Sequence, residues 1–120
     1  MNNNPITTHI LNTALGKPAA SIAMQLFVLK DNEWSLLSSA VTNEYGRIDD
    51  WHETGWYQGK TSEQLFATYK IVFSLEDYWE KQSIDGFYPS AEISFKVQDS
   101  RHHHIPLLLA PYGYSTYRGS

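Results

Sequence analysis

The feature that most constrains the fold of this chain is an alternation of apolar and polar side chains with a period of two. In residues 91–97 every second side chain is apolar, and residues 66–75 show the same pattern. Successive side chains of a β-strand point to opposite faces of a sheet, so this alternation is typical of half-buried antiparallel strands. Residues 21–30 are largely apolar at both sets of alternate positions. This third segment is therefore predicted to be covered on both faces, by the core and by a second subunit.

Shorter segments complete the set of expected strands, at residues 7–13, 34–41, 103–109 and 113–117. Segments rich in turn-forming residues separate the strands. This number of short strands predicts an all-β protein, specifically a two-sheet β-sandwich of about seven to eight strands.

One segment departs from the period of two and is expected to form a single short helix, at residues 74–82. Ser74 is a suitable N-cap, and acidic residues follow it in the first turn. Leu75, Tyr78 and Trp79 have the three- and four-residue spacing of one helical face. The segment is therefore predicted to pack this face against the sandwich.

The length of 120 residues favours one domain with a single core. We expect this domain to span residues 1–120, with a flexible start at residues 1–5. Residues 49–64 are an irregular polar stretch, which we expect on the surface together with Trp51 and Trp56.

The composition narrows the possible functions. The net charge is −4 without a basic cluster, which argues against nucleic-acid binding and favours a small-molecule partner. No segment has the length of a membrane span, and no basic, apolar leader precedes the domain, so a cytoplasmic protein is expected. The chain has no cysteine, hence neither a disulfide nor a thiolate nucleophile. Aromatic residues make up 14% of the chain, which favours burial of rings between subunits.

Chemistry in such a chain must come from histidine and arginine. His9 lies in an expected strand on the face opposite Ile10, and Arg47 follows a glycine that marks a turn. The planar guanidinium of Arg47 is suited to binding a carbonyl-rich ligand through two hydrogen bonds. His104 precedes an apolar segment, where it would be held rigidly as a proton-transfer group.

The run His102-His103-His104 also suggests a metal site. Alternate residues of a strand share a face, so only His102 and His104 could contribute to one site. Further ligands at suitable spacing are absent from the sequence, which argues against a metal site.

Three motifs in this sequence resemble those of the transthyretin-like family, in particular its 5-hydroxyisourate hydrolase branch. They are Thr8-His9-Ile10-Leu11-Asn12-Thr13 with Gly16-Lys17-Pro18-Ala19, Thr42-Asn43 with Gly46-Arg47, and the segment from His104-Ile105-Pro106 to Tyr117-Arg118-Gly119-Ser120. The resemblance covers nearly the whole chain. The ending Tyr-Arg-Gly-Ser distinguishes the hydrolases from the hormone-carrying transthyretins. One departure is His103, which stands where the family commonly has tyrosine.

The resemblance implies a homotetramer, a dimer of dimers, whose central channel holds the active sites. It also implies hydrolysis of 5-hydroxyisourate to 2-oxo-4-hydroxy-4-carboxy-5-ureidoimidazoline in urate catabolism, without a metal or an organic cofactor. The implied catalytic residues are His9, Arg47, His104 and Ser120, with His9, Arg47 and Tyr117 binding the substrate. Either histidine could be the general base.

Two other functions remain open from the sequence. The same sandwich could carry a small ligand without catalysis, because a fold alone does not determine function. A metal-binding sandwich that uses His102 and His104 is the third possibility.

Overall fold

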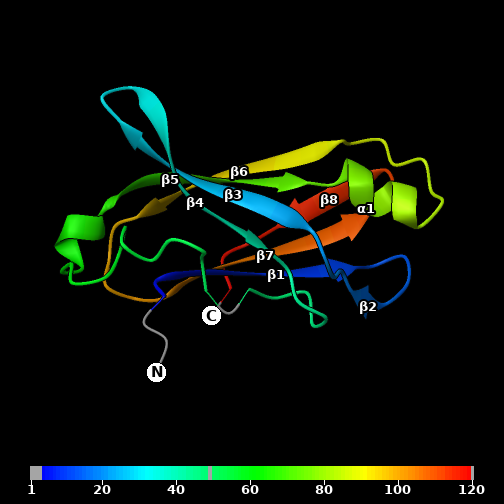
Figure 1. Ribbon diagram of the computed structural model, residues 1–120, viewed down its shortest axis with the longest axis horizontal. Coiled ribbons are helices and arrows are strands. Elements are labelled where there is room, and N and C mark those ends of the chain that lie inside the picture. Colours follow the sequence, from blue (N-terminus) through cyan, green and yellow to red (C-terminus); the bar gives the residue numbers. More distant parts are fainter. Residues whose placement is uncertain (1–3, 49, 120) are drawn as a thin grey trace.

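The computed structural model describes residues 4–48 and 50–119. Within these residues two four-stranded sheets pack face to face, as Figure 1 shows. One sheet has the order β2-β1-β7-β8 and the other β4-β3-β5-β6. The strands are β1 (Ile6–Asn12), β2 (Lys17–Pro18), β3 (Ala23–Lys30), β4 (Glu33–Val41), β5 (Ala67–Ser74), β6 (Ser90–Val97), β7 (His103–Ala110) and β8 (Gly113–Thr116). The predicted β-sandwich is confirmed.

The first sheet is mixed. Its two central strands, β1 and β7, are parallel, whereas β8 runs antiparallel to β7 and β2 antiparallel to β1. Residues of β1 with even numbers, such as Ile6 and Ile10, are buried, and their odd-numbered neighbours are half-buried. One face of this sheet therefore packs into the core and the other faces outward.

The second sheet is antiparallel throughout, with a bulge between Leu26 and Phe27 of β3. The alternation predicted for β5 and β6 is observed, and their inward side chains join the core. On β3 the inward face is buried, while Ala23 and Gln25 on the other face are exposed. A subunit contact over this outer face stays a prediction.

The short helix α1 (Glu76–Lys81) buries Tyr78 and Trp79, as expected. The predicted cap was wrong, because the N-cap position belongs to Leu75 and no side chain caps the helix. Ser74 is instead the last residue of β5. The first turn is held by the carbonyl oxygen of Pro89, which accepts hydrogen bonds from the amides of Leu75 and Glu76 at 2.9 and 3.1 Å.

The segment that was expected on the surface contributes to the core. Trp51 is only 2% exposed, and its indole Nε1 donates a hydrogen bond of 3.0 Å to the carbonyl oxygen of Ile6. Tyr57 is buried as well, whereas Trp56 is half-buried. The polar composition of this stretch concealed these rings because their burial depends on β1, which is distant in sequence. A 3-10 turn, η1 (Glu63–Leu65), ends the segment.

Of the start that was expected to be flexible, residues 1–3 lie outside the described residues, whereas Asn4 and Pro5 form hydrogen bonds. Asn4 is buried, and its side chain accepts a hydrogen bond from the amide of Ile6 at 3.2 Å. The carbonyl oxygen of Pro5 accepts a hydrogen bond of 2.9 Å from the amide of His103. The bond between His103 and Pro5 extends the pairing of β1 with β7 beyond the strand. Among the residues described here, no helix is long and apolar enough to cross a membrane.

Candidate active site

The parallel pairing of β1 with β7 brings two of the predicted site residues to one face. Thr7 is paired with His104, and His9 with Pro106. Since paired residues point to the same side of a sheet, Thr7, His9 and His104 all lie on the outer face. His103 points the other way and is buried with Ile6 and Ile105.

A tight turn delivers Arg47 to the same strand. Arg47 forms an antiparallel bridge with His9, and the amide of Ile10 donates a hydrogen bond of 2.8 Å to the carbonyl oxygen of Gly46. The side chain of Asn43 closes the turn, because its Oδ1 accepts hydrogen bonds from the amides of Tyr45 and Arg47 at 2.9 and 3.1 Å. The turn therefore acts as an extra short strand beside β1.

Gly46 is required by this approach. Its φ of +73° lies in the left-handed region, and a Cβ atom there would clash with the carbonyl oxygen of Ile10. Thr42, just before the turn, is buried and donates a hydrogen bond of 2.9 Å to the carbonyl oxygen of Ala19. The motif around Arg47 thus has a structural role: it fixes where the arginine leaves the backbone.

The charge of Arg47 acts on both candidate histidines. Burial lowers the pKa of His104 most, and the positive charges of Arg47, His102 and His9 lower it further. Burial and then Arg47 lower the pKa of His9, with a smaller opposing effect from the Tyr45 backbone. Both imidazoles are therefore predominantly neutral at pH 7 and able to accept a proton.

Thr7 is a site residue that the sequence did not single out. Its Oγ1 lies 2.6 Å from Nε2 of His102 and 2.8 Å from Nδ1 of His104. A hydroxyl has one proton to donate and two lone pairs that can accept, so at least one of the two histidines must donate its N–H to Thr7. The hydroxyl therefore couples the tautomers of the two rings, which lie nearly parallel with centroids 6.5 Å apart.

The tail after β8 closes over His104. The amide of Gly119 donates a hydrogen bond of 2.8 Å to the carbonyl oxygen of His104, and the two residues form an antiparallel bridge. A Cβ atom on Gly119 would lie 2.6 Å from Cδ2 of the His104 ring, so only glycine fits against the imidazole. Thr116 anchors the tail from the other side, with a hydrogen bond of 2.7 Å from its Oγ1 to the carbonyl oxygen of Pro106.

Tyr117 and Ser120 are the remaining predicted site residues. Tyr117 is 58% exposed and lines a cavity of about 250 Å³ together with His103, His104 and Arg118. Ser120 lies outside the described residues, and its predicted role stays a prediction. Across residues 4–48 and 50–119, no group of three or more histidine, aspartate or glutamate side chains is placed to hold a metal ion. His102 and His104 share a face as expected, but Thr7 lies between them.

The fold and the site define a class: a transthyretin-like β-sandwich with a histidine and arginine centre on the outer face of its mixed sheet. Residues 6–119 match the sequence profile of the HIUase/Transthyretin family. The chain belongs to this family.

Relatives in this family include named hydrolases. The chain is 38% identical over 120 residues to the 5-hydroxyisourate hydrolase of Salmonella dublin, which covers 98% of this chain and 82% of that protein. It is 36% identical to the mouse 5-hydroxyisourate hydrolase, covering 98% of this chain and 96% of the mouse protein.

Solved structures of both branches share the fold. The structure of Klebsiella pneumoniae 5-hydroxyisourate hydrolase aligns with a TM-score of 0.76 at 30% identity, over 96% of this chain and 98% of that one. Sea bream transthyretin in complex with thyroxine aligns with a TM-score of 0.80 at 28% identity, over 96% of this chain and 94% of that one. The backbone fold alone therefore does not separate hydrolase from carrier, and the side chains of the site must do so.

Proposed function

We propose that this protein hydrolyses 5-hydroxyisourate to 2-oxo-4-hydroxy-4-carboxy-5-ureidoimidazoline by opening the N1–C6 amide bond of the substrate, without a metal or an organic cofactor. The observation that carries the proposal is the backbone pairing, which sets Arg47 beside His9 and places His104 on the same face of the sheet as His9. The names of the relatives support the same reaction.

His104 is the group best placed to activate water. In one of the tautomer arrangements that these contacts allow, Nδ1–H of His104 donates to Thr7, and Thr7 in turn donates to Nε2 of His102. Nε2 of His104 then carries the free lone pair, and the lowered pKa keeps it available at neutral pH. In this arrangement His104 accepts a proton from water as the oxygen attacks C6.

Arg47 and His9 are proposed to assist the attack on C6 and the opening of the amide bond. Attack on C6 places a negative charge on the carbonyl oxygen, which the guanidinium of Arg47 is suited to stabilise. As the C6–N1 bond breaks, the nitrogen takes up the proton that His104 removed from water, which returns His104 to its neutral form. The neutral His9 orients the attacking water by hydrogen bonding. Tyr117 and Ser120 are proposed to complete the pocket by hydrogen bonding to the substrate.

We propose that one domain, residues 1–120, carries this site, and that four copies assemble as a dimer of dimers. Large apolar side chains support an assembly because they remain exposed in the single chain, among them Phe87 at 65% and Tyr112 at 72%. The half-open outer face of the mixed sheet, where His9 and His104 lie, would form a wall of a channel between subunits. Light scattering coupled to size exclusion tests the tetramer.

The decisive experiment follows the ultraviolet decay of freshly generated 5-hydroxyisourate, made from urate with urate oxidase, with and without this protein. Faster decay that is lost in His9→Ala and Arg47→Ala variants of wild-type thermal stability would establish the hydrolase. Decay no faster than in buffer, with a folded protein, would instead favour a small-ligand carrier. Insensitivity to a chelator would exclude the third possibility, a metal-dependent site at His102 and His104.

A further inference from the structure

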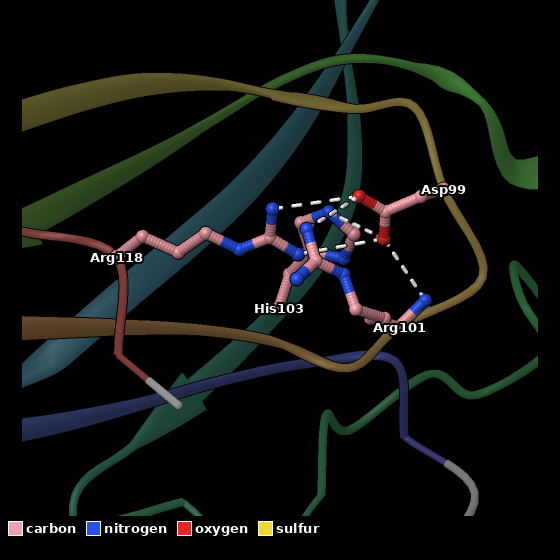
Figure 2. A network of polar contacts seen from close by, with 4 residues as sticks. All are labelled: Asp99, Arg101, His103 and Arg118. Carbon is pink, nitrogen blue, oxygen red and sulfur yellow. Dashed lines mark hydrogen bonds and ion pairs between the residues drawn. The ribbon is translucent and has the colours of Figure 1, made fainter.

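A second polar network lies next to the proposed site, and the proposed mechanism does not use it. Asp99, in the loop between β6 and β7, accepts hydrogen bonds from Nη1 and Nη2 of Arg118, each at 3.4 Å. It also accepts bonds from the amide and the side chain of Arg101 at 2.9 and 3.2 Å. Figure 2 shows the guanidinium of Arg118 pointing from the tail toward the carboxylate of Asp99.

The position of Arg118 in the chain connects this network to the proposed site. Arg118 stands between Tyr117, which lines the cavity beside His104, and Gly119, which bonds to the backbone of His104 and packs on its ring. The tail leaves β8 at Thr116, and as far as Gly119 it forms no further strand, only the isolated bridge of Gly119 with His104. The Asp99 carboxylate is therefore a side-chain anchor between the two backbone attachments of the tail.

Asp99 is well suited to be a permanent anchor. The hydrogen bonds from Arg101 and then from Arg118 hold the pKa of its carboxyl well below the usual range, so it is charged at every physiological pH. The bond from the Arg101 amide closes the loop and orients the carboxylate. Both oxygens can then meet the two terminal nitrogens of Arg118, the bidentate arrangement that gives such pairs their direction.

The buried His103 lies beneath this pair without competing for it. His103 is 4% exposed, and neither ring nitrogen has a hydrogen-bond partner among the described residues. Its Nε2 lies 3.9 Å from Oδ1 of Asp99, beyond hydrogen-bond distance. A neutral His103 leaves the carboxylate to Arg118.

We propose that Asp99 is a positioning residue for the reaction, which acts through Arg118 to hold residues 117–119 against His104. The inference rests on the proposed function for its kinetic readout only. The ion pair is partly exposed, and pairs of this kind contribute modestly. Loss of the anchor is therefore expected to lower kcat by roughly two- to fivefold, with a smaller change in KM.

The test compares Asp99→Ala and Arg118→Ala with Arg101→Ala as the matched control. Arg101 bonds the same carboxylate but does not belong to the tail, so its removal is expected to leave kcat unchanged. The kcat of the double variant Asp99→Ala/Arg118→Ala is expected to fall no further than that of either single variant. The charge swap Asp99→Lys/Arg118→Glu is expected to recover part of the rate.

Hydrogen exchange of the Gly119 amide provides a readout that does not depend on activity. This amide bonds to His104, so its exchange in Asp99→Ala is expected to accelerate by the same roughly two- to fivefold. Unchanged Gly119 exchange and unchanged kcat in Asp99→Ala would overturn the positioning role. If the wild-type protein does not hydrolyse 5-hydroxyisourate but Gly119 still exchanges faster in Asp99→Ala than in the wild type, the proposed function is overturned and the anchor is supported.

Discussion

The hydroxyl oxygen of Thr7 lies 2.8 Å from Nδ1 of His104, although the two residues are 97 positions apart in the sequence. The bond exists because β1 and β7 are parallel neighbours with Thr7 opposite His104. Through it, a residue with no ionisable group determines which nitrogen of His104 is free for proton transfer. The first prediction follows from this contact.

Replacement of Thr7 by valine keeps the shape of the side chain and removes the hydroxyl. The tautomer of His104 is then no longer held, and kcat is expected to fall by about 3- to 10-fold, the value of one hydrogen bond. Thr7→Ser, which retains the hydroxyl, should keep most of the rate. Equal rates for Thr7→Val and the wild type would show that His104 does not depend on this bond.

Gly119→Ala places a methyl group against the imidazole of His104. The added Cβ would lie 2.6 Å from Cδ2, so either the ring or the tail must move. A displacement of this size in an active site can cost up to about 10²-fold in kcat. Gly113→Ala is the matched control, because a Cβ there meets open space. Steady-state rates and melting temperatures are measured for both variants. Equal kcat values for Gly119→Ala and Gly113→Ala would contradict the close packing of Gly119 on the His104 ring.

The pH dependence of activity should have an acidic limb below pH 6.5. Burial and the charge of Arg47 both lower the pKa values of His9 and His104, so activity is expected to persist below the ordinary histidine pKa and to fall only as these lowered values are crossed. In Arg47→Gln, NMR titration should show both histidine pKa values raised. Titration curves that coincide with those of the wild type would place Arg47 outside the site.

The stability of the fold should also decrease in acid, because of His103. Burial and then Arg118 lower its pKa in the folded state, with smaller opposing effects from Asp99 and the Arg101 backbone and a further lowering by His102. The unfolded chain therefore binds more protons below pH 6.5, and the free energy of unfolding falls as the pH drops from above 6.5 through the lowered value.

His103→Phe tests this dependence. It removes two buried nitrogens that lack hydrogen-bond partners within the described part of the chain, so the variant is expected to be about 1 kcal/mol more stable than the wild type at pH 7. The difference should widen at pH 5. Urea unfolding at the two pH values measures it, and a constant difference would exclude His103 as the titrating group.

Much of the fold was predictable from local pattern. The strands at residues 66–75 and 91–97 were recognised because each alternates with one buried and one open face, and a period of two has no other simple interpretation. The errors concern residues whose environment is set by distant segments. Trp51 was expected at the surface because its neighbours are polar, yet it is buried through a bond to Ile6. Ser74 was expected to cap helix α1, but the hydrogen bonds at the start of this helix go to the carbonyl oxygen of Pro89.

The sequence by itself determined the strand content, the family and the identity of His9, Arg47 and His104 as candidates, because periodicity and motif are properties of neighbouring residues. Only the tertiary structure decided that Thr7 couples His102 to His104 and that Gly119 packs on the imidazole. It alone also showed that Asp99 holds Arg118. Such contacts join residues that are 15 (Gly119 and His104) to 97 (Thr7 and His104) positions apart, and they depend on strand register. The register is set by the packing of the whole sandwich rather than by any local pattern.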